Sequence, residues 1–367
     1  MTNFLYFCRK FWFNSSFLEI MQIETHPEKI ALYGKTLGEL TDICQSEALP
    51  KFVARQLANW LYKHHVTSFE MMTNLSQRTR EQLAERYCIG LSAPERVEIS
   101  TDGTKKYLFR TSQGAGIESA YIPDRERATL CISSQAGCRM GCRFCATSRM
   151  GLLHSLSTCE ILNQIASLPE RDKLTNIVLM GMGEPLDNID NVERAIEIMC
   201  SDWGYGWSPT RITLSTAGVS RNLRRILDHT AVHLAISLHN PFHEERAAIM
   251  PIENAYPIAD CIAILREYDF THQRRISFEY IVMSGLNDSM RHIKELCRLL
   301  NGIKCRINLI RFHKIPDSPY FSPDNDAMIR FRDTLTARGI MTTIRTSRGE
   351  DIKAACGLLS TADSKEK

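Results

Sequence analysis

A repeated alternation of strand-like and helix-like segments after Ala128 limits the folds open to this 367-residue chain more than any other feature. Short apolar runs alternate with helix-like stretches such as 158–168, 191–200 and 288–300. Units of this length favour parallel strands joined by helical crossovers. The predicted strands cover 128–133, 176–181, 211–216, 233–239, 275–282 and 305–312. Six such units predict an α/β fold, a partial (β/α)6 barrel of the TIM type.

The chain before this core divides into a helical region and a short β region. Helical periodicity in "KFVARQLANWLYKHH" places Phe52, Leu57 and Leu61 on one predicted apolar stripe together with Trp60. Three strand-like segments separated by glycine-containing turns then indicate an antiparallel meander. The predicted domains are an N-terminal extension at 1–20, a small helical accessory domain at 21–95, a β meander at 96–126, the barrel at 127–359 and a polar tail at 360–367. The extension would be absent if Met21, rather than Met1, is the true start.

Charge and hydropathy exclude several classes of protein. The 45 Lys and Arg residues exceed the 42 acidic residues by a net charge of only +3, so any nucleic-acid surface has to be local. No apolar run reaches the roughly 18 residues that span a bilayer. Arg9 and Lys10 also interrupt the aromatic opening segment where a signal peptide would be continuous. We therefore expect a soluble, cytoplasmic protein with no membrane partner.

Thirteen cysteines are scattered along the chain. Because the number is odd and no export signal precedes them, a structural disulfide framework is not expected. Four cysteines fall close together between Cys131 and Cys145 and need a chemical explanation. Most of the others are predicted to be core thiols: Cys44, Cys88, Cys159, Cys200, Cys261, Cys297 and Cys305.

Cys138, Cys142 and Cys145 follow the first predicted barrel strand with the spacing C-x3-C-x2-C. A structural zinc site needs four closed ligands, whereas three thiolates suit a 4Fe-4S cluster that leaves one iron open for a substrate. With Phe144 before the last cysteine, the loop resembles the radical S-adenosylmethionine (SAM) superfamily. That resemblance implies that the open iron binds the amino and carboxylate groups of SAM. A zinc site is the alternative.

Further polar motifs follow the predicted strands, at the end where sites occur in such barrels. Gly183 allows the backbone to approach a ligand, and Glu184 can accept hydrogen bonds from an ammonium group. Beside the cysteine loop, both are predicted to bind SAM, although Glu184 alone would also fit a solvated loop. The same prediction covers Ser215, Ser237, Leu238 and His239, although serine at a strand end is often only a helix cap.

Cys131 precedes Cys138 by seven residues and lies on the predicted strand, so it needs a partner outside the loop. The candidate is Cys356, near the end of the barrel region. Three nearby basic residues would favour its thiolate, namely Arg345, Arg348 and Lys353. The alternative for Cys356 is an ordinary buried thiol next to two alanines.

Several segments are similar to the RlmN and Cfr family of adenine methyltransferases, among them "GIESAYIPDRERATLCISSQAGC", "GMGEPLDN", "TLSTAGV" and "TSRGEDIKAACG". The resemblance runs from about Tyr107 to Leu359, and the helical N-terminal region also fits the family as an RNA-binding domain. It implies a radical SAM barrel with one 4Fe-4S cluster and two SAM molecules per turnover. It also implies that the substrates are 23S ribosomal RNA and transfer RNA.

The resemblance assigns a role to each remaining residue. Cys356 would take a methyl group from one SAM, and a radical made from the second SAM would remove hydrogen from that methyl group so that its carbon adds to adenine. Cys131 would then release the product through a transient disulfide with Cys356, and Glu118 would accept the proton. The family's SAM-contacting Asn is replaced here by His313, which departs from the pattern.

The resemblance also implies partners. An electron donor such as flavodoxin or ferredoxin has to reduce the cluster, and the protein is expected to be a monomer. Methylation at adenine C2 is favoured by the intact N-terminal region. The alternatives are Cfr-type methylation at C8, another radical SAM reaction in which Cys356 is incidental, and a non-catalytic, zinc-stabilised RNA-binding protein. Arginines expected to contact RNA are Arg125, Arg127, Arg139, Arg143, Arg149, Arg345 and Arg348.

Overall fold

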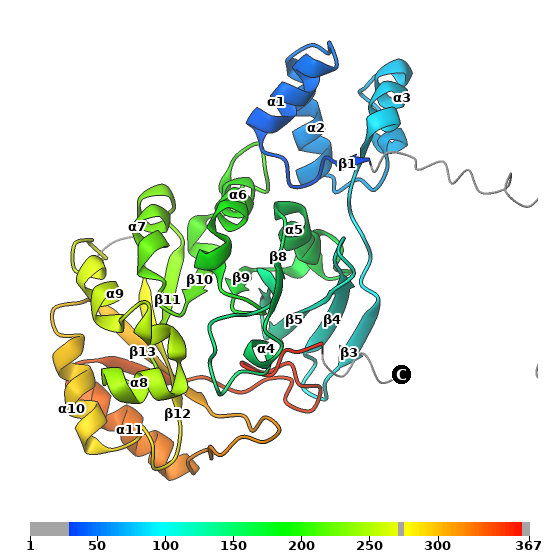
Figure 1. Ribbon diagram of the computed structural model, residues 1–367. Helices are drawn as coiled ribbons and strands as arrows, with labels where there is room; N and C mark the ends of the chain where they lie inside the picture. Colours follow the sequence, from blue (N-terminus) through cyan, green and yellow to red (C-terminus); the bar gives the residue numbers. More distant parts are fainter. Residues whose placement is uncertain (1–28, 271–274, 362–367) are drawn as a thin grey trace, which may run out of the picture.

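The computed structural model describes residues 29–270 and 275–361. The predicted extension at 1–20, the choice between Met1 and Met21, and residues 362–367 of the predicted tail lie outside these ranges. Within them, a small helical unit precedes a large α/β core (Figure 1). None of the helices in the described ranges combines the length and the hydropathy that a membrane span requires.

One ten-stranded sheet organises the core, in the order β14-β13-β12-β11-β10-β9-β6-β5-β4-β3. From β6 to β14 every neighbouring pair is parallel, and β5, β4 and β3 extend the sheet antiparallel from β6. Because β14 and β3 stand at opposite ends of this order, the barrel is open, which confirms the predicted partial α/β barrel with an antiparallel extension. The strands are β3 Arg96–Ile99, β4 Lys105–Arg110, β5 Gly116–Asp124, β6 Arg127–Cys131, β9 Asn176–Leu179, β10 Ile212–Thr216, β11 His233–Ser237, β12 Ile276–Val282, β13 Cys305–Arg311 and β14 Met341–Ile344.

The parallel part of the sheet has one strand more than the sequence predicts. Strand β14 pairs with β13, with Met341 opposite Arg306. Its four residues include two threonines, and only Thr342 among them is buried. No apolar run therefore marks this strand, because backbone pairing with β13 rather than its own hydropathy selects it.

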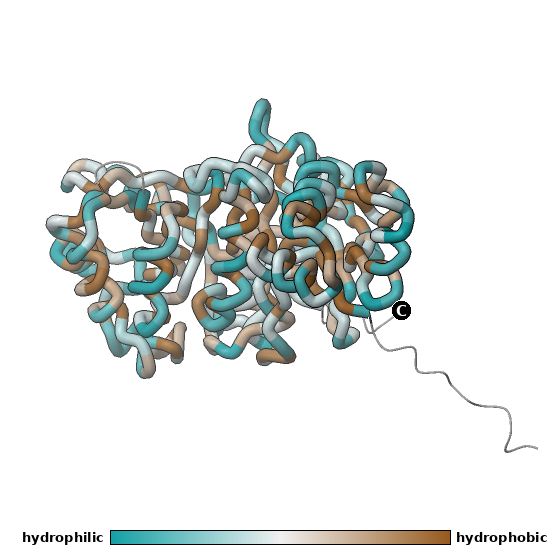
Figure 2. Tube along the Cα trace, turned by 90° about the horizontal axis from the view of Figure 1, so that it is seen from above, coloured by the Kyte–Doolittle hydropathy of each residue, from teal (hydrophilic) through white to brown (hydrophobic). Residues whose placement is uncertain are grey.

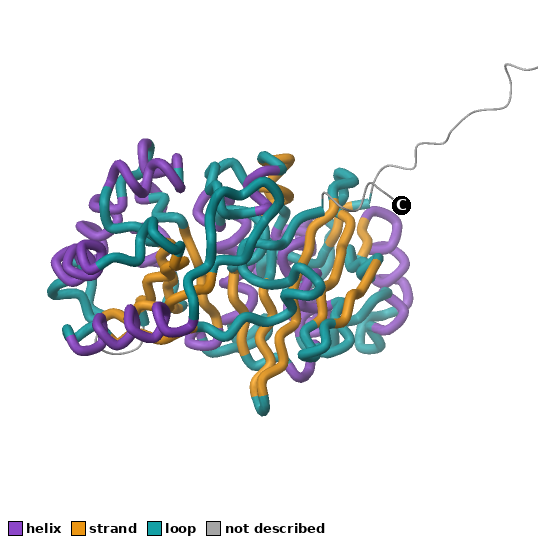
Figure 3. The backbone as a smooth tube through the Cα atoms, turned by 90° about the horizontal axis from the view of Figure 1, so that it is seen from below, coloured by secondary structure: helices purple, strands orange, loops and turns teal. Residues whose placement is uncertain are grey.

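Helices alternate with the parallel strands, and the strands run side by side through the core with helices beside them (Figure 3). The core helices are α4 Ala146–Arg149, α5 Thr158–Ala166, α6 Ile189–Cys200, α7 Ser220–His229, α8 His243–Ile249, α9 Ile258–Leu265, α10 Met290–Leu299 and α11 Asn325–Ala337. Short 3-10 helices are η1 Phe69–Met71, η2 Arg171–Lys173, η3 Pro185–Asn188, η4 Pro209–Arg211 and η5 Pro251–Asn254.

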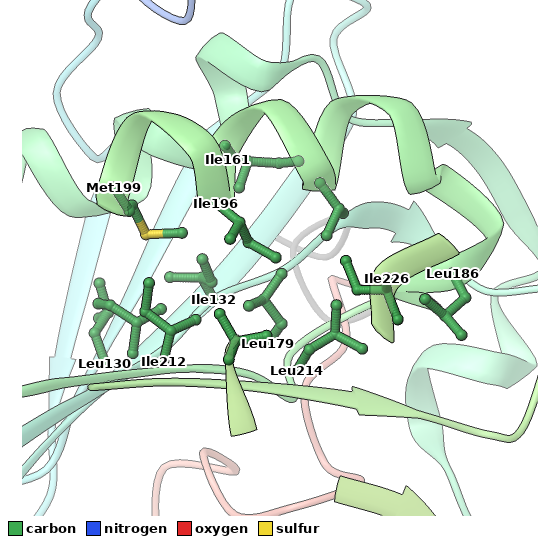
Figure 4. Close-up of a cluster of buried hydrophobic side chains, with 14 of the residues drawn as sticks. Leu130, Ile132, Ile161, Leu179, Leu186, Ile196, Met199, Ile212, Leu214 and Ile226 are labelled. Carbon is green, nitrogen blue, oxygen red and sulfur yellow. The ribbon is translucent and has the colours of Figure 1, made fainter. Parts of the chain in front are cut away.

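The apolar core lies between the sheet and its helices. Leu130 and Leu179 on the strands meet Ile196 and Met199 of α6, and Ile226 of α7 joins the same cluster (Figure 4). Full burial of a side chain of this size contributes about 1.5–3 kcal/mol. Apolar and polar residues alternate along the helices as this one-sided burial requires (Figure 2). The same packing fixes the strand ends, where the predicted site residues lie.

The helical unit consists of α1 Leu37–Ser46, α2 Phe52–Tyr62 and α3 Gln77–Arg86, with β1 Ile30–Ala31 parallel to β2 Tyr87–Cys88. It contacts the core through buried aromatic rings: the hydroxyls of Tyr33 and Tyr205 are hydrogen-bonded at 2.6 Å. The predicted stripe on α2 is wrong at one position. Phe52 is 64% exposed, because Leu57 and Leu61 define a buried face from which Phe52 is turned away.

Candidate active site

Two adjoining cavities lie at the carboxyl ends of the parallel strands. The cluster cavity, of about 150 Å³, is lined by Cys138, Cys142 and Cys145 together with residues from five parallel strands, β9 to β13. The thiol cavity, of about 160 Å³, is lined by Cys131 and Cys356. Several residues line both cavities: Cys145, Met180, Gly181, Ile310, Arg345, Cys356 and Gly357. The structure therefore brings the two predicted cysteine groups together.

The cysteine loop is closed at its base by the strands β7 Gln135–Gly137 and β8 Leu152–Ser155, which pair antiparallel. Gly137 has a φ of +77°, and a Cβ there would lie 1.9 Å from the carbonyl oxygen of Gly151. Only glycine fits this position. The Cys138 amide also donates to Gly151 at 2.9 Å, so the first and last residues of the loop are held together.

The three loop thiols have the chemistry that an iron-sulfur cluster needs. Burial raises the pKa of each, to about 12 for Cys138, and the neighbouring thiols raise that of Cys142 further. Thiols in this setting become thiolates when a metal centre supplies positive charge. In the described part of the chain, no group of three or more His, Cys, Asp or Glu side chains is arranged to hold a single metal ion. The loop thiols instead line a common cavity, which fits a cluster whose cysteines each bind a different iron.

Glu184 lies 3% exposed in the wall of the cluster cavity, directly before η3. Its Oε1 accepts the amide of Leu186 at 3.1 Å, and its Oε2 accepts the amide of Ala217 at 2.7 Å. Burial raises the pKa of this carboxyl group to about 7. The alternative of a solvated loop carboxylate is wrong. Gly183, with a φ of +98°, lets the chain pass against Gln135 and lines the same cavity.

Three of the four other predicted SAM residues line the cluster cavity, namely Ser215, Ser237 and His239. Leu238 is fully buried and does not belong to the lining. Its backbone amide donates to the backbone carbonyl of Glu279 at 3.0 Å. The His239 Nδ1 accepts the amide of Ile281 at 3.0 Å, which leaves the ring hydrogen on Nε2. Burial lowers its pKa to about 3, so the ring is a neutral donor.

Neither Cys131 nor Cys356 forms a disulfide, and no disulfide links the cysteines within the described ranges. Burial raises the pKa of Cys131 to about 12, and the Cys356 thiol adds to this effect. The guanidinium of Arg345 lies beside both thiols, and Cys356 is the main reason that the Arg345 pKa is raised. Glu279, on β12, holds Arg345 at 3.4 Å. A fixed positive charge therefore stands where either thiolate would form.

Glu118, on β5, is 2% exposed, so the alternative of an exposed strand residue is wrong. Glu118 lines neither cavity. Its carboxylate pairs with the buried Lys106 at 3.2 Å and accepts the amide of Ser360 at 2.9 Å. Burial raises the pKa of Glu118, and Lys106 opposes this shift. The structure thus joins Glu118 to the segment that directly follows Cys356.

His313 lines the thiol cavity and not the cluster cavity. Its Nδ1 lies 3.1 Å from Glu350, and its Nε2 lies 3.3 Å from the hydroxyl of Ser347. Burial lowers its pKa, against the attraction of Glu350. His313, at the position of the family's SAM-contacting Asn, therefore lines the cavity of the two thiols and not the cavity lined by Gly183 and Glu184.

The predicted RNA-contacting arginines have different environments. Arg345 lines both cavities and pairs with Glu279, and about a third of its side chain remains exposed. Arg139 is exposed and pairs with the buried Asp187, while Arg348 lies 3.5 Å from Asp124. The remaining four are exposed, namely Arg125, Arg127, Arg143 and Arg149.

Sequence reasoning missed two buried charged residues at the site. Glu279 is 3% exposed, lines the cluster cavity and accepts hydrogen bonds from Asn308 at 2.7 Å and Ser277 at 2.9 Å. Its signal was a charged residue within the apolar strand "ISFEYIV", since such a residue needs a buried partner. Arg246 is fully buried on α8, and its helix-like surroundings gave no such signal.

Comparisons with known proteins agree with this geometry. Residues 132–300 match the profile of the radical SAM superfamily, and residues 30–89 match that of the ribosomal RNA large subunit methyltransferase N-terminal domain. The chain is 53% identical over 338 residues to "Probable dual-specificity RNA methyltransferase RlmN" of Bacteroides fragilis, which covers 92% of this chain and 98% of that protein. It is 42% identical over 339 residues to "Dual-specificity RNA methyltransferase RlmN" of Syntrophus aciditrophicus, covering 91% and 97%.

A solved structure shows the same fold. The crystal structure of a radical SAM methyltransferase from Sphaerobacter thermophilus matches with a TM-score of 0.84 and 39% sequence identity. The match covers 90% of this chain and 99% of that chain, so it includes the helical unit, the antiparallel extension and the barrel together.

Proposed function

Because this chain belongs to the RlmN family of radical SAM RNA methyltransferases, we propose that it methylates C2 of adenine in 23S ribosomal RNA and in transfer RNA, through a methyl group carried on Cys356. One observation carries the proposal. Cys356 lines both cavities, and Cys131 lines the second. One side chain can therefore receive a methyl group on one side and present it to RNA on the other.

The residues of the cluster cavity divide into two roles. Cys138, Cys142 and Cys145 would hold the 4Fe-4S cluster, which when bound supplies the electron that cleaves SAM to a radical able to take hydrogen from an S-methyl group. Glu184 would accept a hydrogen bond from the SAM amino group through its buried carboxylate oxygens. Contacts to the rest of SAM come from Gly183, Ser215, Ser237, His239 and the backbone of Leu238.

The two remaining thiols perform the transfer. The Cys356 thiolate attacks the methyl carbon of one SAM, S-adenosylhomocysteine leaves, and Cys356 becomes a methyl thioether. The methylene radical adds to adenine, and the adduct then loses one proton and returns one electron, for which the oxidised cluster would be the acceptor. The Cys131 thiolate next attacks the Cys356 Sγ. The carbon–sulfur bond breaks, its electron pair stays with the carbon, and that carbon takes a proton to become the methyl group. Arg345 favours the thiolate in both steps, and a reductant resets the disulfide.

Glu118 is proposed to accept the proton that adenine loses. Burial raises its pKa above that of an exposed glutamate, which makes its carboxylate a stronger base. Its hydrogen bond to Ser360 couples it to the Cys356 segment, although a small movement of that segment is needed to bring adenine within its reach. The exposed arginines around the cysteine loop would bind RNA phosphates, and the helical unit would contribute further RNA contacts. Because ribosomal and transfer RNA are the proposed substrates, the reaction is proposed to occur in the cytoplasm. A flavodoxin or ferredoxin would be the reductant, and the active form would be a monomer.

The central experiment is intact-protein mass spectrometry on anaerobically purified enzyme. With SAM and no RNA, we expect one added methylene on the wild type and none on Cys356→Ser. With RNA, Cys131→Ser should accumulate a covalent protein–RNA adduct that the wild type does not. Full RNA methylation by Cys356→Ser would contradict the mechanism, and a colourless, zinc-containing protein would favour the non-catalytic alternative.

Methylation of C8, as by Cfr, uses the same thiols and is the second candidate. The named relatives and the matched N-terminal domain favour C2. Digestion of the RNA product to nucleosides and comparison with 2-methyladenosine and 8-methyladenosine standards separates the two positions. Product at C8 alone would overturn the proposed position while leaving the roles of the thiols intact.

A further inference from the structure

Arg246, on α8, is a fully buried charged residue behind the cluster cavity, outside the proposed machinery. Its guanidinium binds carbonyl oxygens from two strand ends. Nη2 donates to Ala217 and to Ser237, both at 2.8 Å, and Nε donates to Leu238 at 2.9 Å. Ala217 follows β10, and Ser237 ends β11. One side chain therefore ties together the ends of two neighbouring strands.

Two of the three bound carbonyls belong to residues that form the cavity wall. Ala217 and Ser237 both line the cluster cavity. Ala217 also donates its amide to the Glu184 carboxylate at 2.7 Å. Arg246 therefore binds the carbonyl of Ala217, and the amide of the same residue binds the Glu184 carboxylate.

The charge of Arg246 is balanced by Glu253 in η5, which is 1% exposed and forms an ion pair with Nη1. Glu253 also accepts the amide of Ile258 at 2.9 Å and lies 2.8 Å from His243. A buried ion pair is tolerated only where its hydrogen-bonding groups are satisfied. The planar guanidinium, with five donors in fixed directions, can bind all these acceptors at once, whereas a lysine ammonium has only three donors.

We propose that Arg246 is a positioning residue for SAM, which fixes Ala217 and through it the Glu184 carboxylate in the orientation that receives the SAM amino group. The inference rests on the role of Glu184 in the proposed function. It concerns SAM affinity and does not depend on which adenine carbon is methylated.

The test measures binding of radiolabelled SAM by equilibrium dialysis, with cluster-reconstituted full-length protein and no RNA. Arg246→Lys keeps the charge opposite Glu253 but loses part of the carbonyl network, and we expect SAM to bind about tenfold more weakly. The visible absorbance of the cluster and the urea unfolding midpoint should show that the variant is loaded and folded. If it does not fold, the double variant Arg246→Gln with Glu253→Gln removes both buried charges and takes its place.

Coupling to Glu184 separates positioning from a general structural role. Glu184→Gln should also weaken SAM binding, and adding Arg246→Lys to it should weaken binding by less than about twofold further. Arg225→Lys is the matched control, because Arg225 pairs with Glu193 and Asp190 on α6 and lines neither cavity. We expect it to bind SAM like the wild type.

Additive losses in the double variant, or unchanged affinity in a folded Arg246 variant, would overturn the inference while the role of Glu184 stands. Unchanged affinity in Glu184→Gln would instead remove that role from the proposed function, and the inference with it. The two failures are therefore distinguished by whether Glu184→Gln keeps its affinity for SAM.

Discussion

The backbone amide of Ala146 donates a hydrogen bond of 2.8 Å to the carbonyl oxygen of Gly357. Ala146 directly follows Cys145, the last cysteine of the loop, and Gly357 directly follows Cys356. The next residue of α4, Thr147, adds a second link, because its hydroxyl donates to the carbonyl of Leu359 at 2.6 Å. The segment that carries Cys356 has no helix or strand, so its position depends on these bonds to the cysteine loop together with the bond from Ser360 to Glu118.

Loss of the buried Thr147 hydroxyl should loosen the Cys356 segment. Thr147→Val keeps the shape of the side chain but leaves the Leu359 carbonyl without its donor, which should cost about 1–3 kcal/mol of unfolding free energy. Methyl transfer from SAM to Cys356, followed by intact mass, should slow by about tenfold or less while SAM affinity changes little. Thr230→Val is the control, since Thr230 donates to Ile226 at 2.8 Å at the end of α7, away from the site. Equal methyl-transfer rates in both variants would argue against a positioning role for this bond.

The pair of Glu118 and Lys106 allows proton transfer to be separated from stability. Glu118→Gln removes the negative charge that faces the buried ammonium of Lys106 and should lower the free energy of unfolding by about 1–3 kcal/mol. The same variant should methylate RNA more slowly. The double variant Glu118→Gln with Lys106→Met removes both charges and should recover most of the stability. Methylation should stay low in the double variant if Glu118 accepts the proton. Recovery of both properties together would assign Glu118 a structural role only.

His313→Asn replaces this chain's residue by the one expected from the family pattern. Because His313 lines the thiol cavity and pairs with the exposed Glu350, the change should alter unfolding free energy by less than about 1 kcal/mol. SAM affinity, measured by equilibrium dialysis, should stay within about twofold of the wild type. Tighter binding by tenfold would mean that position 313 does contact SAM.

Titration of His65, at the contact between the helical unit and the core, should make the free energy of unfolding depend on pH. Burial lowers its pKa to about 4, with Arg171 acting in the same direction, and its ring lies 5.4 Å from that of Tyr205. The unfolded chain, with an ordinary histidine pKa of about 6.5, binds this proton more readily than the folded chain. The neutral His65 ring therefore makes its full contribution to the free energy of unfolding above about pH 6.5, and this contribution is lost as the pH falls toward 4.

The measurement is urea unfolding of the wild type and His65→Asn at pH 7 and pH 5. Asn tolerates the φ of +49° at this position. Since the ring is only partly buried, we expect the wild type to lose about 1–2 kcal/mol more than the variant over this range. His64→Asn, an exposed substitution at the preceding residue, is the control. Parallel losses in the wild type and His65→Asn would show that His65 is not the titrating group.

Local patterns predicted most of the fold and the arrangement of the site. All six predicted barrel strands are present. Each is marked by an apolar run of strand length between polar turns, a signal contained in a few consecutive residues. Strand β14 was missed, since its stability comes from pairing with β13. The burial of Glu118 and the carbonyl network of Arg246 were also missed, because both depend on segments that are distant in the sequence.

The spacing of Cys138, Cys142 and Cys145 is a property of a single short loop, so the sequence alone predicted that these thiols would face one another. Cys131 and Cys356 lie at opposite ends of the barrel region in the sequence, and only the folding of the chain around the open parallel sheet brings them to one cavity. Covalent connection limits distances over a few residues, whereas over the length of a domain only packing does so. The family resemblance predicted the pair, but the folded chain decided which side chains stand around it: Arg345 and His313 beside the thiols, and Glu118 outside both cavities.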